Sequence, residues 1–87
     1  MRKAYHIRLR KHFHRALIET RERRELSQAQ MAEKLAMDER SYIDLDHGKT
    51  CCSAVTLVLF LIYVCEDVDK FLLELKRALE ESQNKAA

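Results

Sequence analysis

Four residues whose side chains can bind a metal ion lie in one stretch of the sequence: His47, Cys51, Cys52 and Cys65. In structural zinc sites a short segment usually separates two cysteine ligands, whereas adjacent cysteines rarely bind one ion well. A free cysteine in an apolar segment commonly packs as a small hydrophobic side chain. We therefore predict packing roles for the cysteines, no metal site and no cofactor, with metal binding or a thiol switch as the alternative.

The sequence lacks the residue arrangements that support catalysis. It contains one glycine, too few for a glycine-rich phosphate loop, and it shows neither a Ser-His-Asp spacing nor a His–carboxylate cluster. Its 87 residues suffice for one small domain with a single core. We predict that the protein is not an enzyme. Because a separate ligand domain would not fit, we also expect no small-molecule ligand.

Positive charge is concentrated at the start of the chain. Residues 1–24 contain nine Lys or Arg and two Glu, although the net charge of the whole chain is only +2. Such a segment can bind phosphates, and a solvated helix face is the alternative. We predict a mobile basic arm over residues 1–7, with a short extended segment as the alternative, and expect His6, His12 and His14 to face phosphate or solvent. The residues expected to contact phosphates are Arg2, Lys3, Arg8, Arg10 and Lys11.

A run of 15 residues from Cys51 to Cys65 carries no charge. As a helix it would be about 22 Å long, which is shorter than the roughly 30 Å hydrocarbon core of a bilayer. We therefore expect no membrane partner. The odd number of cysteines, and an N-terminus without an apolar signal region, predict a reducing, cytoplasmic location.

The composition predicts an all-α fold that can position these side chains. The sequence has no Pro and one Gly, although turns in β proteins use both residues heavily, and it is 47% hydrophobic and 34% charged. Apolar spacing and capping residues predict five helices joined by short connections. These helices are expected at residues 8–24, 27–35, 39–46, 53–64 and from 66 onward.

Two of the predicted helices form a helix-turn-helix at about residues 28–46. Ser27 and Asp38 are good N-cap residues, and Gln30 completes a capping box with Ser27. Only a three-residue turn separates the two helices, which is the spacing of this motif. A small residue is needed where they cross, and Ala32 supplies it. The apolar residues expected to pack between them are Met31, Leu35, Met37, Tyr42 and Leu45.

The runs RERRELSQAQMAEKL (21–35) and SYIDLDHGKT (41–50) resemble the Cro/repressor-type helix-turn-helix family, also called XRE-like or lambda-repressor-like. The resemblance covers about residues 13–65. It implies a five-helix lambda-repressor-like DNA-binding domain from a bacterium or phage. The implied organisation is the arm 1–7, the DNA-binding domain 8–65 and a C-terminal helix within 66–87.

The resemblance also implies roles for individual residues. Arg40 is the expected base reader, since a guanidinium can bridge O6 and N7 of guanine. Arg21 and Asp46 match a structural basic–acidic pair of the family, and Ala36 stands where the family favours Gly. The residues implied to contact DNA are Gln28, Glu39, Arg40, Ser41, Ile43, Asp44, His47, Lys49 and Thr50.

The last two predicted helices have more apolar surface than a small monomer easily covers. We therefore predict a homodimer, with folding of the last helix back over helix 53–64 as the alternative. The predicted function is that of a homodimeric transcriptional repressor bound to double-stranded DNA. The alternative is a protein-interaction module or antitoxin-like component with weak DNA binding. The expected interface residues are Val58, Ile62, Leu72, Leu75 and Leu79.

Overall fold

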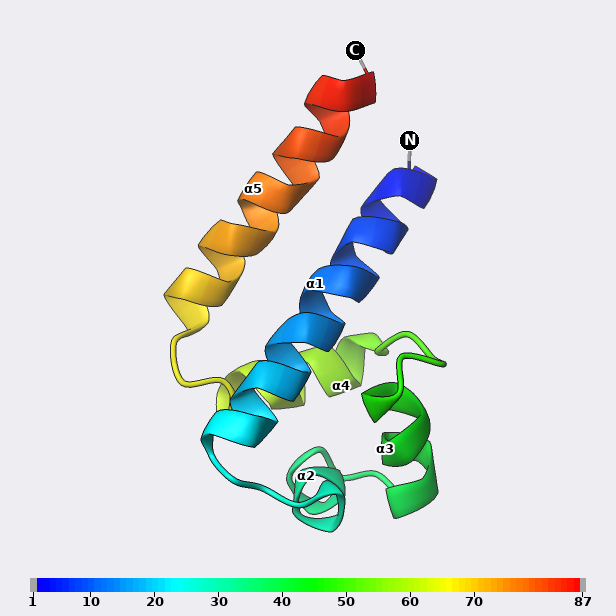
Figure 1. Ribbon diagram of the computed structural model, residues 1–87, viewed down its shortest axis with the longest axis vertical. Helices are drawn as coiled ribbons and strands as arrows, with labels where there is room; N and C mark the ends of the chain where they lie inside the picture. Colours follow the sequence, from blue (N-terminus) through cyan, green and yellow to red (C-terminus); the bar gives the residue numbers. More distant parts are fainter. Residues whose placement is uncertain (1, 87) are drawn as a thin grey trace.

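The computed structural model describes residues 2–86, with side chains described for residues 2–81. Within this range the chain is all-helical, which confirms the prediction of an all-α, five-helix domain (Figure 1). A single π-helical turn, η1 (Phe60–Val64), continues the fourth helix. The five helices are α1 (Arg2–Arg23), α2 (Gln28–Lys34), α3 (Glu39–Asp46), α4 (Ala54–Leu59) and α5 (Val68–Ala86). No helix in the described range is both long and apolar enough to cross a membrane.

Helix α1 begins at Arg2, so the prediction of a mobile or extended arm is wrong for residues 2–7; Met1 lies outside the described residues. Tyr5, Leu9 and Phe13 are spaced four residues apart and are partly or fully buried on one helix face. Helix α5 runs antiparallel to α1 and packs along it (Figure 1). The first turns of α1 are helical because α5 gives this face a partner.

The hydrophobic core lies between α1, the α2–α3 pair, the α4–η1 helix and α5. Phe60 is at its centre: its ring packs edge-on against Phe13 at 5.2 Å and lies 5.7 Å from the ring of Phe71. Ala32 is buried, as expected for the small residue at the α2–α3 crossing. The fully or nearly fully buried apolar residues are Phe13, Leu17, Met31, Ala32, Leu35, Tyr42, Leu45, Phe60, Val64 and Phe71.

The connection between η1 and α5 is fixed to the end of α1. The Nε of Arg23 lies 2.7 Å from a carboxylate oxygen of Glu66, and Arg24 donates a hydrogen bond to the carbonyl of Val64. Asp67 accepts a hydrogen bond from the backbone N–H of Lys70, so α5 starts at Val68 rather than at residue 66. These contacts direct α5 along α1, whereas the alternative prediction placed it over helix 53–64.

Helices α1, α2 and α3 each end in the same turn, in which one residue has positive φ. These residues are Glu25 and Ala36, both at φ 54°, and Gly48 at 74°. In each turn the N–H of the next residue bonds to the carbonyl five residues earlier, which is the Schellman arrangement. Only Gly48 adopts this conformation without a steric penalty, since a Cβ in the left-handed region costs about 1–2 kcal/mol.

We expect Ala36→Gly to raise the free energy of unfolding by about 1 kcal/mol, because it removes the strain of positive φ at an exposed site. Ala29→Gly is the matched control, since Ala29 is exposed but helical, and it should lower stability by about 0.5–1 kcal/mol. Urea unfolding followed by circular dichroism measures both changes. A loss of stability in both variants would contradict the assigned turn.

Candidate nucleic-acid interface

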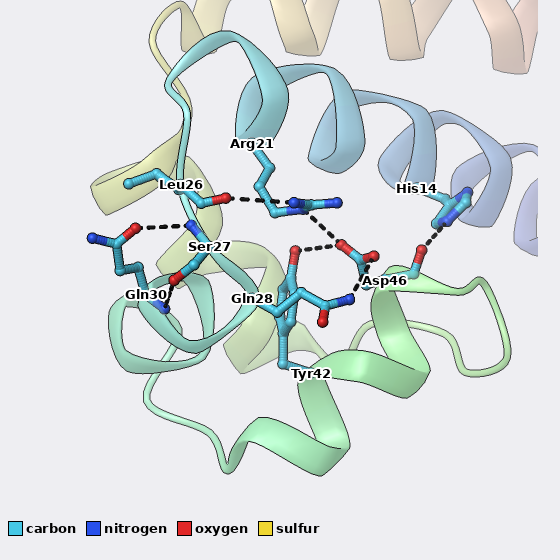
Figure 2. A network of polar contacts seen from close by, with 8 residues as sticks. All are labelled: His14, Arg21, Leu26, Ser27, Gln28, Gln30, Tyr42 and Asp46. Carbon is cyan, nitrogen blue, oxygen red and sulfur yellow. Dashed lines mark hydrogen bonds and ion pairs between the residues drawn. The ribbon is translucent and has the colours of Figure 1, made fainter.

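One buried carboxylate joins the first three helices (Figure 2). Asp46, at the end of α3, is only 8% exposed. One of its oxygens accepts hydrogen bonds from the Nε of Arg21 and the hydroxyl of Tyr42, each at 2.9 Å. The other oxygen lies 3.2 Å from the amide nitrogen of Gln28. The structure thus brings the expected Arg21–Asp46 pair together, and it adds α2 to the same network.

The surroundings of the Tyr42 hydroxyl keep it protonated. Burial, and then the hydrogen bond to Asp46, raise the pKa of Tyr42 well above its usual range, so the phenol stays neutral and remains a donor. The guanidinium of Arg21 also donates to the carbonyl of Leu26, just before the N-cap of α2. No buried side-chain nitrogen or oxygen within the described residues lacks a hydrogen-bond partner.

Side-chain caps define where α2 and α3 begin. Ser27 accepts from the backbone N–H of Gln30, whose side chain accepts from the N–H of Ser27, which is the expected capping box. Asp38 accepts from both the N–H and the hydroxyl of Ser41. These hydrogen bonds hold the pKa of Asp38 below its usual value, with the hydroxyl as the larger cause. Each cap therefore sets a helix start independently of the core.

The residues expected to face DNA lie on α3 and the turn that follows it. Glu39, Arg40 and Ser41 are exposed at the start of α3, while Ile43 and Asp44 are half-buried further along it. The exposed residues of the following turn are His47, Lys49 and Thr50. Helix α3 lies across the molecule from α5, with α1 between them (Figure 1). Among the described residues, the N-terminal part of α3 is thus exposed and lies away from α5.

Two residues of the expected DNA-facing set have partners within the protein. Gln28 is half-buried, and its amide nitrogen donates to Asp46. The hydroxyl of Ser41 donates a hydrogen bond to a carboxylate oxygen of Asp38. Sequence reasoning missed both roles. The role of Ser41 had a local signal, because it lies three residues after the N-cap Asp38. The role of Gln28 had none, because it depends on how α2 crosses α3.

The basic residues at the start of the chain do not form one flexible phosphate-binding segment. Arg2 and Lys3 are exposed near the end of α1 that lies away from α2 (Figure 1). Arg8 and Lys11 line a cleft between α1 and α5. Arg10 donates a short hydrogen bond of 2.6 Å to the carbonyl of Gly48 and so anchors the turn after α3.

Two histidines that were expected to face phosphate or solvent instead contact backbone carbonyls. The Nε2 of His14 lies 2.7 Å from the carbonyl of Asp46, which is a second link between α1 and the end of α3 (Figure 2). His12 is buried, with its Nε2 3.2 Å from the carbonyl of Phe71 on α5. The two residues are two positions apart and so lie on different sides of α1, His12 toward α5 and His14 toward the end of α3.

The three cysteines are free thiols; Cys51 is exposed, and Cys52 and Cys65 are half-buried. Within the described part of the chain, no group of three or more His, Cys, Asp or Glu side chains is arranged to hold a metal ion. No protein-family model, curated protein or solved structure matches this chain.

We expect Asp46→Ala to lower the free energy of unfolding by about 3 kcal/mol, because it leaves Arg21 and Tyr42 without their acceptor in a buried site. Asp44→Ala, two residues earlier on the same helix and half-buried, is the control and should change stability by about 0.5 kcal/mol or less. Denaturant unfolding at neutral pH compares the two. Equal losses would show that the network does not hold the helices together.

Proposed function

We propose that the protein is a Cro/repressor-type helix-turn-helix regulator: a homodimeric repressor that binds double-stranded DNA and reads the major groove with α3. The observation that carries the proposal is the free N-terminal face of α3, with Arg40 exposed on it. Helix α3 is packed on α2 across a short turn and held to α1 through Asp46. A recognition helix needs this combination of an open face and a fixed orientation.

The chemistry of the exposed side chains suggests a division of roles. Arg40 can donate two hydrogen bonds to a guanine, a contact worth roughly 1–3 kcal/mol of discrimination. Lys49 and Thr50, in the turn anchored by Arg10, are suited to phosphate oxygens. Glu39 and Asp44 can only accept hydrogen bonds, so they favour cytosine N4 or disfavour other sequences by repulsion.

Exposed apolar side chains support the homodimer. On α5, Leu72 is 47% exposed, and on the α4–η1 helix Val58 and Ile62 are more than half exposed. Leu75 and Leu79 are half-buried beside Leu72 in a shallow apolar groove. Association through such surfaces removes them from water. To bind two half-sites one turn of the duplex apart, the dimer must hold its two α3 helices about 34 Å apart.

The DNA contacts are tested by selecting the purified protein on a randomised duplex pool and measuring affinity against salt. We expect a two-fold symmetric site, relaxed base preference at one position for Arg40→Ala, and uniformly weaker binding with a smaller salt slope for Lys49→Ala. Arg77→Ala, exposed on α5, is the matched control and should leave sequence preference unchanged. Wild-type affinity and base preference in both Arg40→Ala and Lys49→Ala would overturn the proposal.

The dimer is tested separately by sedimentation equilibrium. We expect Leu72→Asp to shift the wild-type dimer toward monomer, because a charge would be buried in the interface. Ile7→Asp is the control, since Ile7 is also 47% exposed but lies outside the proposed interface. A wild-type protein that sediments as a monomer, or equal dissociation in both variants, would contradict an α5 interface.

A second candidate function is a protein-interaction or antitoxin-like role. It is favoured by four apolar residues on the α4–η1 helix that are more than half exposed: Val55, Val58, Ile62 and Tyr63. Such a patch commonly marks a protein interface. The protein-interaction role replaces the regulator if two results are found together. DNA selection would yield no enriched site, and Arg40→Ala and Lys49→Ala would leave any weak, salt-sensitive binding to DNA unchanged.

A further inference from the structure

Cys51 and Cys52 occupy a segment without regular secondary structure between α3 and the Ser53 cap of α4. Adjacent side chains of an extended chain point in opposite directions, yet both of these cysteines line the same groove. Cys51 is exposed and Cys52 is half-buried, so the two thiols differ in their access to solvent.

Both cysteines line a groove of about 330 Å³ at the side of α1. Its apolar walls include Ile7, Phe13 and Leu45. Its size falls within the range of pockets that hold small organic molecules. The groove therefore offers apolar contacts to a ligand group bonded at the two sulfur atoms.

The reactivity of the pair differs between its members. Burial, and then the neighbouring Cys51, raise the pKa of Cys52 to about 11, so Cys52 remains a thiol at neutral pH. Cys51 is the accessible member and reacts first. Adjacent cysteines suit a structural zinc ion poorly, because such a site needs four ligands. A soft centre that takes only two sulfur ligands does not have this requirement.

We propose that Cys51 and Cys52 form a binding site for trivalent arsenic, with the organic substituent of a mono-organoarsenical in the adjoining groove. In the reaction with an organoarsonous acid, two As–S bonds form and two As–O bonds break. The two thiol protons leave with the hydroxyl groups as two water molecules, and no electrons are transferred. The second condensation is intramolecular, which favours it over binding to a single thiol.

The test is titration of the reduced full chain with phenylarsine oxide, followed by intact mass and by counting free thiols. We expect one phenylarsenic group per chain and a fall from three free thiols to one. Cys51→Ser and Cys52→Ser should each lower the affinity about 100-fold, because the second As–S bond is lost. Cys65→Ser is the matched control and should bind like the wild type.

The exposed position of Cys51 keeps the test decisive even if Cys52→Ser weakens the fold. Wild-type affinity in Cys51→Ser, or loss of the adduct in Cys65→Ser, would overturn the proposal. The groove is tested with Ile7→Ser. This change should lower the affinity for phenylarsine oxide about fivefold, because an apolar contact is lost, and leave the affinity for arsenite unchanged. If Ile7→Ser changed the affinity for phenylarsine oxide and for arsenite equally, the groove would not be part of the binding site. No readout involves DNA, so failure here is distinct from failure of the proposed regulator.

Discussion

The arrangement of α1, α2 and α3 depends on the hydrogen bonds that one carboxylate, that of Asp46, accepts. Asp46 receives donors from α1, α2 and its own helix, so the relative positions of three helices are linked at a single buried group. A buried charge is expensive unless it is paired and hydrogen-bonded. The three donors meet that requirement only when the helices are in this arrangement. The network therefore opposes alternative packings of α2 and α3 that an apolar core alone would tolerate.

The same region illustrates what the sequence could predict. Ser27, Asp38 and Gly48 act through atoms a few residues away, so their roles as caps follow from spacing alone. The small Ala32 at the crossing and the apolar residues around it follow from helical periodicity. The Arg21–Asp46 contact was available through the resemblance to a known family, and the structure places these two residues together.

Other contacts had no signal of this kind. His12 and His14 bond to backbone carbonyls, which every residue carries, so their partners leave no mark in the sequence. The helical start of α1 depends on α5, which lies at the far end of the described chain. The π-helical turn at Phe60–Val64 is marked by a hydrogen bond from the N–H of Cys65 to the carbonyl of Phe60, five residues earlier, and an apolar run does not predict that pattern.

The antiparallel pairing of α1 with α5 also affects how the chain acquires its structure. Contact between the first and last helices joins segments of large sequence separation, and closing such a loop costs chain entropy before it is rewarded. During synthesis α1 leaves the ribosome well before α5, so its apolar stripe and the face of Phe60 that Phe71 covers stay open until α5 emerges. Completion of the core therefore waits for α5, and the nascent chain passes through a stage in which α2 and α3 have been synthesised while α1 still lacks its partner helix.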